Sequence, residues 1–378
     1  MYSGKLWKGL RVAKEKSKSS GYDYVILVPV ILLIGIGLVM VYSASSHLAA
    51  HRFGDSYFYL KRQTLFCLFG IALMIAAKNI PCRVYSKLVY PLLLISCCLL
   101  ILLLTSGLGY KVGGATRWLR LAGFSFQPSE FAKFALAVYM AYSISKKGSE
   151  MGSFSKGLLP HLLVAGAFML LVVLQPDLGT AVIIGCWLFL LLFVGGVKVL
   201  HLFLMPLLSA PILIWLIWQQ DYRIKRWWAF INPWDDPKGA GFQITHSFLS
   251  FGSGGIFGAG LGNSKQKLFY LPEAHTDFVL SIAAEELGFL GVTCIMALFG
   301  LLIVQGIRVA LSARDLYSSY LALGLTCWIG LQVLVNSAVV VGLLPTKGLT
   351  LPLISYGGSS LVLTLLGIGV LLNISSRT

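Results

Sequence analysis

Residues 270–288 read Tyr270-Leu-Pro-Glu-Ala-His-Thr-Asp277-Phe-Val-Leu-Ser-Ile-Ala-Ala-Glu-Glu-Leu-Gly288 and open an apolar run that continues to about residue 306. A helix of this length can cross the ~30 Å hydrocarbon core of a bilayer. Asp277 would then lie at the mouth of a membrane helix, where a half-desolvated carboxylate can still reach a substrate with a polar head and a lipid tail. Asp is also a favoured N-cap residue, so a purely capping role is the simpler alternative.

The rest of the chain repeats this apolar pattern. Of the 378 residues, 57% are hydrophobic and only 12% are charged, whereas soluble domains carry about 25% charged residues. The composition predicts an all-α, polytopic integral membrane protein, because a helix satisfies its own backbone in lipid. The ten apolar runs lie at about 24–46, 63–78, 87–105, 128–145, 158–174, 178–197, 201–219, 278–306, 317–342 and 356–374.

This pattern predicts a basic tail over residues 1–20, followed by one transmembrane domain over residues 21–378. A long external loop, about residues 220–276, joins helices 7 and 8. The net charge is +16. Short segments placed inside carry about twice as many Lys and Arg as those placed outside, which puts both termini in the cytoplasm. The basic residues therefore indicate orientation and contact with anionic membrane lipids, and not binding of nucleic acid.

Two features of the predicted seventh helix and its loop suggest movement. Pro206 and Pro211 lie within the run at 201–219, and we expect them to kink or break the helix. Six glycines follow between residues 252 and 262. They predict a flexible, partly re-entrant lid.

Ionisable residues gather at the external ends of the predicted spans. Such groups are costly at membrane depth and by default indicate a functional site. Glu130 and Lys133 can also simply pair with each other, and Arg223 and Arg226 can anchor the chain at the membrane interface. Together these residues predict a wide polar cavity. Its members are Arg117, Arg120, Glu130, Lys133, Asp177, Arg223, Lys225, Arg226, Asp277 and Lys347, with Glu285 and Glu286 either at its floor or in structural pairs.

The mixture of many cations and few carboxylates suits a substrate that carries phosphate, because Arg and Lys stabilise phosphoryl oxygens. The sequence holds no ATP-binding motif. A lipid-linked pyrophosphate sugar would carry the energy in its own leaving group. Transfer from such a donor needs one general base and cations at the departing pyrophosphate. We predict that Asp277 is that base.

Five motifs together resemble the SEDS family of membrane glycosyltransferases, and the resemblance covers nearly all of the chain beyond the tail. Gly348-Leu-Thr350 and the residue before His275 are more similar to the branch of the family that acts in cell division than to the elongation branch. The motifs are Gln127-Pro-Ser-Glu-Phe-Ala-Lys133, Gln175-Pro-Asp-Leu-Gly-Thr180, Asn232-Pro-Trp-Asp-Asp-Pro237, Tyr270-Leu-Pro-Glu-Ala-His-Thr-Asp277-Phe and Leu344-Pro-Thr-Lys-Gly-Leu-Thr-Leu-Pro-Leu-Ile-Ser-Tyr-Gly-Gly-Ser-Ser360.

The resemblance implies a ten-helix peptidoglycan glycosyltransferase that polymerises lipid II on the outer face of the bacterial cytoplasmic (inner) membrane, at the division septum. It also implies a class B penicillin-binding transpeptidase and other division proteins as partners. Asp277 matches the essential aspartate of the family. The candidate substrate-binding residues are Arg117, Glu130, Lys133, Asp177, Arg223, Arg226, His275, Thr276 and Lys347.

Other functions fit parts of the pattern. A lipid II flippase would use a broken helix near the bilayer midplane, and an elongation polymerase would use the same chemistry. A scaffold that recruits division proteins explains neither Asp277 nor the cations, although it can hold in addition. The sequence identifies no cofactor with certainty, and a divalent cation, Mg²⁺ or Mn²⁺, is compatible with the reaction.

Overall fold

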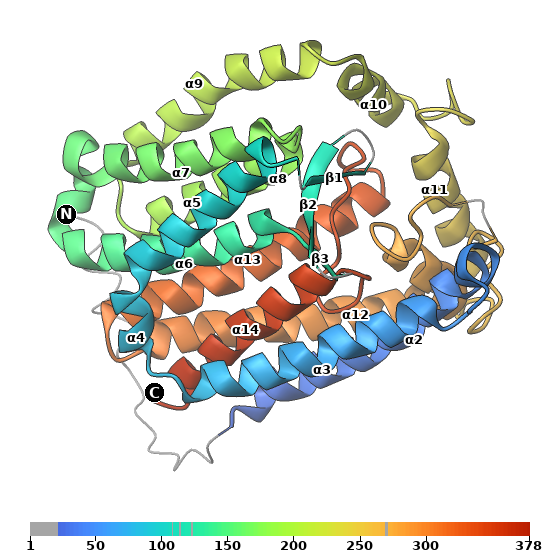
Figure 1. The fold of residues 1–378 in the computed structure, drawn as a ribbon, viewed down its shortest axis with the longest axis horizontal. Coiled ribbons are helices and arrows are strands. Elements are labelled where there is room, and N and C mark those ends of the chain that lie inside the picture. The colour runs from blue at the N-terminus through green and yellow to red at the C-terminus, as the bar shows by residue number, and fades with distance from the viewer. Residues whose placement is uncertain (1–21, 108, 113–114, 122–123, 269–270) are drawn as a thin grey trace.

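The computed structural model describes residues 22–107, 109–112, 115–121, 124–268 and 271–378 (Figure 1). The predicted basic tail, residues 1–20, lies outside the described residues. Most of the described chain is helical, and most of the long helices lie side by side in one bundle (Figure 1). The predicted all-α class is confirmed.

Each of the ten predicted apolar runs forms one long helix. Seven described helices are long and apolar enough to cross a membrane, and α5 and α8 are apolar but shorter. A multi-pass membrane architecture is therefore confirmed, whereas the number of ten crossings stays a prediction. The helices are α2 (Tyr24–Phe53), α3 (Phe58–Asn79), α5 (Val89–Thr105), α6 (Pro128–Lys147), α7 (Leu159–Val173), α8 (Leu178–Val194), α9 (Val199–Trp218), α12 (Val279–Ser312), α13 (Leu316–Val340) and α14 (Gly358–Ser375).

Shorter elements connect the long helices, and one group of them was not predicted. Between α5 and α6 the chain forms an antiparallel sheet in the order β1 (Gly109–Val112), β2 (Ala115–Leu121) and β3 (Phe124–Phe126). Strands this short show little periodicity in the sequence, so this segment was expected to be a loop. The loop between α9 and α12 contains two shorter helices, α10 (Asp221–Ile231) and α11 (Phe242–Gly254). The other short described helices are α4 (Cys82–Lys87), η1 (Gly148–Gly152) and η2 (Phe154–Leu158).

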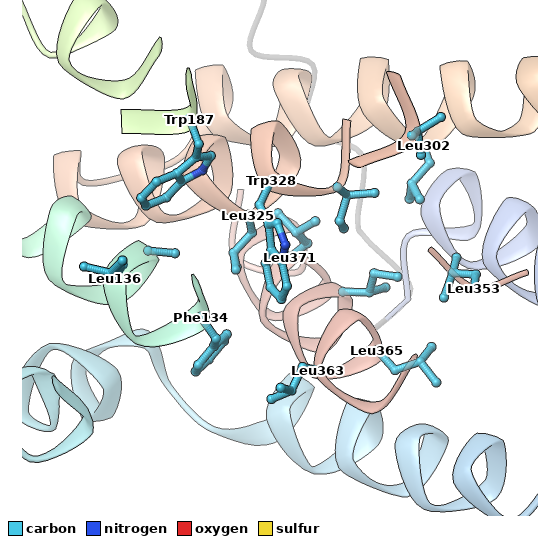
Figure 2. Close-up of a cluster of buried hydrophobic side chains, with 14 of the residues drawn as sticks. Phe134, Leu136, Trp187, Leu302, Leu325, Trp328, Leu353, Leu363, Leu365 and Leu371 are labelled. Carbon is cyan, nitrogen blue, oxygen red and sulfur yellow. The ribbon is translucent and has the colours of Figure 1, made fainter. Parts of the chain in front are cut away.

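The core lies where α6, α8, α13 and α14 meet, and Figure 2 shows its large side chains, among them Phe134, Trp187 and Trp328. Trp187 also donates its indole N–H to the Gly324 carbonyl of α13 at 2.8 Å. Small residues let the helix backbones approach closely. A Cβ on Gly369 of α14, for example, would lie 2.3 Å from the backbone of α3. These contacts pack α3, α6, α8, α13 and α14 against one another.

The sequence predicted that Pro206 and Pro211 kink or break the seventh helix; a break is wrong, and a kink stays a prediction. Helix α9 continues from Val199 to Trp218 across both Pro206 and Pro211. Each proline removes one backbone donor, and the remaining hydrogen bonds hold the helix. Ser209 donates its hydroxyl to the Pro206 carbonyl at 3.3 Å.

The broken helix is α12, at Gly288. Gly288 has φ 68° and ψ −167°, which interrupts the helical hydrogen bonds on both sides. Residues 255–260 fill the interruption, because their backbone exchanges four hydrogen bonds with residues 285–290. The glycine-rich segment at 255–260 is therefore bonded to α12 in this structure, and the predicted lid over residues 252–262 stays a prediction.

Glu285 and Glu286 hold the chain that follows this segment. The Glu286 carboxylate accepts a hydrogen bond from the Lys267 ammonium at 2.8 Å, and both side chains are buried. Ser43 on α2 donates to the same carboxylate at 2.6 Å. Glu285 accepts from the backbone N–H of Lys265 at 2.9 Å. These contacts support structural pairing of the two carboxylates and not a place at the floor of the cavity.

Candidate active site

Asp277 lies in the turn that precedes α12, outside the membrane-spanning helix. Its backbone N–H donates to the Glu273 carbonyl at 3.1 Å. The N-cap position of α12 is Phe278, and no side chain caps this helix. The capping alternative for Asp277 is therefore wrong, and its half-buried side chain keeps part of its surface open.

Charges from three other elements act on the Asp277 carboxyl. Burial raises its pKa most, and the Glu273 carboxylate raises it further. Arg117 on β2, Arg226 on α10 and Lys347 in the loop before α14 act in the opposite direction, and the resulting pKa is about 7. A carboxyl with a pKa near the operating pH is suited to act as a general base.

Arg117 connects the sheet to the beginning of α8. Its Nε lies 3.5 Å from Asp177 Oδ2, and its Nη2 donates to the Pro176 carbonyl at 2.9 Å. Asp177 caps α8 by accepting from the Thr180 N–H at 3.2 Å and hydroxyl at 2.8 Å. Burial raises the pKa of Asp177, but Lys347, Arg117 and the Thr180 hydrogen bonds outweigh it and hold the pKa below its ordinary value. Asp177 is thus an ionised anchor for the two cations.

Lys347 presents an amine without a protein partner. Its Nζ is buried and has no hydrogen-bond partner among the described residues. Burial lowers its pKa to about 7, against the opposing effect of Asp177. The side chain lies on the backbone of Gly179, where a Cβ would come within 1.8 Å of Lys347 Cε. Because buried polar groups normally find a partner, this amine is suited to bind an anionic ligand oxygen.

Glu130 and Lys133 on α6 form a buried pair behind these groups. Lys133 Nζ lies 2.7 Å from Glu130 Oε1, and both side chains are almost completely buried. The Lys133 ammonium also lies 5.5 Å from the centre of the Trp328 ring. The predicted pairing of the two residues is confirmed. They act on Lys347 through their charges.

The two arginines of α10 have different environments. Arg226 Nη1 donates to the Thr346 carbonyl at 3.4 Å and so joins α10 to the loop that carries Lys347. Arg223 Nη1 instead donates to the Leu216 carbonyl of α9 at 2.6 Å. The structure therefore brings Arg226, but not Arg223, to Asp277.

His275 and Thr276 support the turn. The buried His275 ring lies 4.6 Å from the ring of Tyr59 and 5.7 Å from that of Tyr356, centre to centre, and burial lowers its pKa. Thr276 donates its hydroxyl to the Glu273 side chain at 3.0 Å. In this structure the contacts of both residues are with neighbouring protein groups.

The sequence reasoning missed Asn336 on α13, because within the apolar runs it considered only ionisable residues. Asn336 Nδ2 donates to the Asp277 carbonyl at 2.9 Å and to the Leu349 carbonyl at 2.6 Å. A buried amide in an apolar run needs partners for its polar atoms. That requirement was the signal that could have identified it.

The donor set does not form a protein-built metal site. Within the described ranges, no group of three or more His, Cys, Asp or Glu side chains lies close enough to hold a metal ion. Mg²⁺ prefers carboxylates together with water and substrate phosphates, and Asp277 faces three cations. These residues therefore do not fit a bound Mg²⁺ or Mn²⁺.

Comparisons with known proteins agree with this geometry. Residues 24–378 match the FtsW/RodA/SpoVE family model, described as a cell cycle protein. The probable peptidoglycan glycosyltransferase FtsW of Geobacter sulfurreducens is 49% identical over 94% of this chain and 95% of its own length.

Two solved structures are similar over nearly the whole chain. One is a chain of a peptidoglycan synthase complex described as coordinating polymerization and crosslinking, with TM-score 0.76 and 30% identity over 94% of this chain and 98% of that one. The other is the rod shape determining protein RodA of Thermus thermophilus, with TM-score 0.69 and 31% identity over 94% of this chain and 97% of its own.

Proposed function

The chain belongs to the FtsW/RodA/SpoVE family of cell cycle proteins, and on this premise we propose that it polymerises lipid II into glycan strands. It is a peptidoglycan glycosyltransferase of the cell-division branch, because the curated relatives at 41–49% identity include proteins named FtsW. The elongation alternative has less support, since the RodA structure is 31% identical.

One observation carries the proposed mechanism. The Asp277 carboxyl, in a partly exposed residue, has a pKa of about 7 and feels the charges of three cations that come from separate elements. A glycosyl transfer with pyrophosphate as the leaving group requires this combination. The base must accept a proton, and the cations must stabilise negative charge that develops on the leaving group.

The reaction follows from these positions. Asp277 accepts the proton of the acceptor sugar's 4-hydroxyl as that oxygen attacks the anomeric carbon of the donor. The bond from this carbon to the pyrophosphate oxygen breaks, and the pyrophosphate leaves with the electron pair. Lys347, Arg117 and Arg226 stabilise its charge. Attack opposite to the leaving group inverts the anomeric centre, so an α-linked donor gives a β linkage.

The partner and the location are part of the proposal. The similar chain in a peptidoglycan synthase complex supports a class B penicillin-binding transpeptidase as partner. We place the site on the outer face of the inner membrane at the septum, with both termini in the cytoplasm. The flippase alternative relied on a broken seventh helix, and α9 is continuous. The break in α12 is filled by the protein's own backbone.

Asp277→Asn tests the mechanism with purified protein and labelled lipid II. Asn keeps the size of the side chain but cannot take the proton. We expect normal production, normal thermal stability and lipid II binding, with polymer formation reduced on the order of 10²–10⁴-fold. Polymerisation by Asp277→Asn near the wild-type rate would exclude Asp277 as the base.

A further inference from the structure

Asn336 joins the two segments that carry the catalytic charges. It lies near the end of α13, and its side chain is almost completely buried. One amide nitrogen donates to the Asp277 carbonyl at 2.9 Å and to the Leu349 carbonyl at 2.6 Å. Leu349 follows Lys347 by two residues. A single side chain from a third element therefore bonds to both the turn of the base and the loop of the cation.

The orientation of this amide is fixed by its partners. Both neighbours are carbonyl oxygens, which only accept hydrogen bonds, so the NH₂ group of Asn336 must face them. Its Oδ1 is then buried with no partner among the described residues. An unpaired buried oxygen is destabilising. Stability alone therefore does not explain an amide at this position.

A second contact fixes the carboxylate itself. A Cβ built on Gly348 would lie 2.8 Å from Asp277 Oδ2, so the carboxylate packs directly against the backbone of the Lys347 loop. The backbone of Asp277 is held through Asn336, and its side chain is seated on Gly348. These are independent contacts between the same two segments.

We infer that Asn336 is a positioning residue that holds the Asp277 turn and the Lys347 loop at a fixed separation, so that the base and the cation act on one substrate. The inference rests on the proposed function. A displacement of about 1 Å in a catalytic group can cost on the order of 10² in rate, and removal of a bond shared by both segments permits such a displacement.

Asn336→Leu tests this role, because Leu has nearly the same shape and lacks both donors. The matched control is Gln332→Met. Gln332 lies one helical turn earlier on α13, is completely buried, and its side chain has no hydrogen-bond partner among the residues described. The assay measures kcat and KM for polymerisation of labelled lipid II, with the unfolding temperature in detergent measured alongside.

We expect kcat of Asn336→Leu to fall about 10–10²-fold, with KM changed less than about threefold. The acidic limb of the pH profile should also move to lower pH, because a released Asp277 regains water and burial no longer raises its pKa as far. Gln332→Met should keep kcat within about twofold. If Asn336→Leu is not obtained folded, Asn336→Ser takes its place. We again expect kcat to fall and the acidic limb of the pH profile to move to lower pH.

Equal kcat in the Asn336 variant and wild type, or an equal loss in Gln332→Met, would overturn the positioning role. An unmoved acidic limb would also overturn it, since a merely structural defect lowers the amount of active protein without moving the profile. Asp277→Asn in the same assay separates the two claims. If it is inactive while Asn336→Leu is fully active, only the positioning role fails. If Asp277→Asn is active, the proposed mechanism fails.

Discussion

Asp277 and Lys347 both have a pKa near neutral pH, although the ordinary pKa of a carboxyl is low and that of an amine is high. Burial raises the pKa of Asp277 to about 7 and lowers that of Lys347 to about 7. The base must be deprotonated, so activity should fall as the pH drops below about 7. The cation must be protonated, so activity should fall as the pH rises above about 7. We predict a narrow bell-shaped profile of kcat/KM, which reports the pKa values of the free enzyme.

Lys347→Arg identifies the basic limb of this profile. Arginine stays protonated at every pH of the assay. The fall in rate above about pH 7 should therefore disappear, while the acidic limb that belongs to Asp277 remains. The variant's absolute rate can be lower without affecting this readout. A basic limb that persists in Lys347→Arg would show that another group produces it.

Gly179 offers a way to displace Lys347 without changing its charge. We predict that Gly179→Ala lowers the polymerisation rate about tenfold or more, because the new Cβ would come within 1.8 Å of Lys347 Cε. The lysine end is flexible, so it should move and the protein should still fold. Gly185→Ala on the same helix is the control, since its Cβ would meet nothing closer than 3.6 Å. Equal rates in the two variants would refute the prediction.

At the scale of elements, the break in α12 depends on Gly288. A residue with φ 68° is strained unless it is glycine, and a Cβ at Gly288 would lie 2.3 Å from the backbone of Gly258. We predict that Gly288→Ala lowers the free energy of unfolding by about 2 kcal/mol or more. Gly300→Ala on the same helix meets nothing within 4 Å and should be neutral or stabilising by up to about 1 kcal/mol. Thermal unfolding in detergent measures both, and a wild-type melting profile for Gly288→Ala would contradict the account.

The same elements show what the sequence could predict. The long apolar runs identified every long helix, because a membrane helix must satisfy its own backbone and its length is set by the bilayer. The short sheet and the break at Gly288 were missed. The break depends on hydrogen bonds with a segment far away in the chain. The strands of the sheet are too short to show a period in the sequence. The prolines in α9 do not break the helix, since its remaining hydrogen bonds can tolerate them.

The candidate site was predictable in part, for a similar reason. The gathering of ionisable residues at the external ends of the apolar runs selects Asp277, Arg117 and Lys347 directly from the sequence. The partners that fix their positions are an amide, Asn336, and a glycine, Gly348. Neither carries a charge, so only their place in the fold reveals what they contact.

At the scale of the whole molecule, the base and its cations lie at the ends of α8, α12 and α14 that we place outside. The opposite end of the bundle is tied by Asp23, whose carboxylate accepts from Gln305 on α12 at 2.9 Å and from Ser375 on α14 at 2.6 Å. If the basic residues orient the chain as the positive-inside rule requires, the Asp23 end faces the cytoplasm.

Single cysteines test this orientation in intact cells on a background without the seven native cysteines. Lys238→Cys, in the exposed loop between α10 and α11, should react with a membrane-impermeant maleimide added outside. Ser149→Cys, in the exposed η1 segment at the other end of the bundle, should react only after the membrane is permeabilised. Both positions are exposed, so a difference in labelling reports the side of the membrane and not burial. Labelling of Ser149→Cys in intact cells would place the charged site on the cytoplasmic face, and a polymerase of the outer leaflet could not work there.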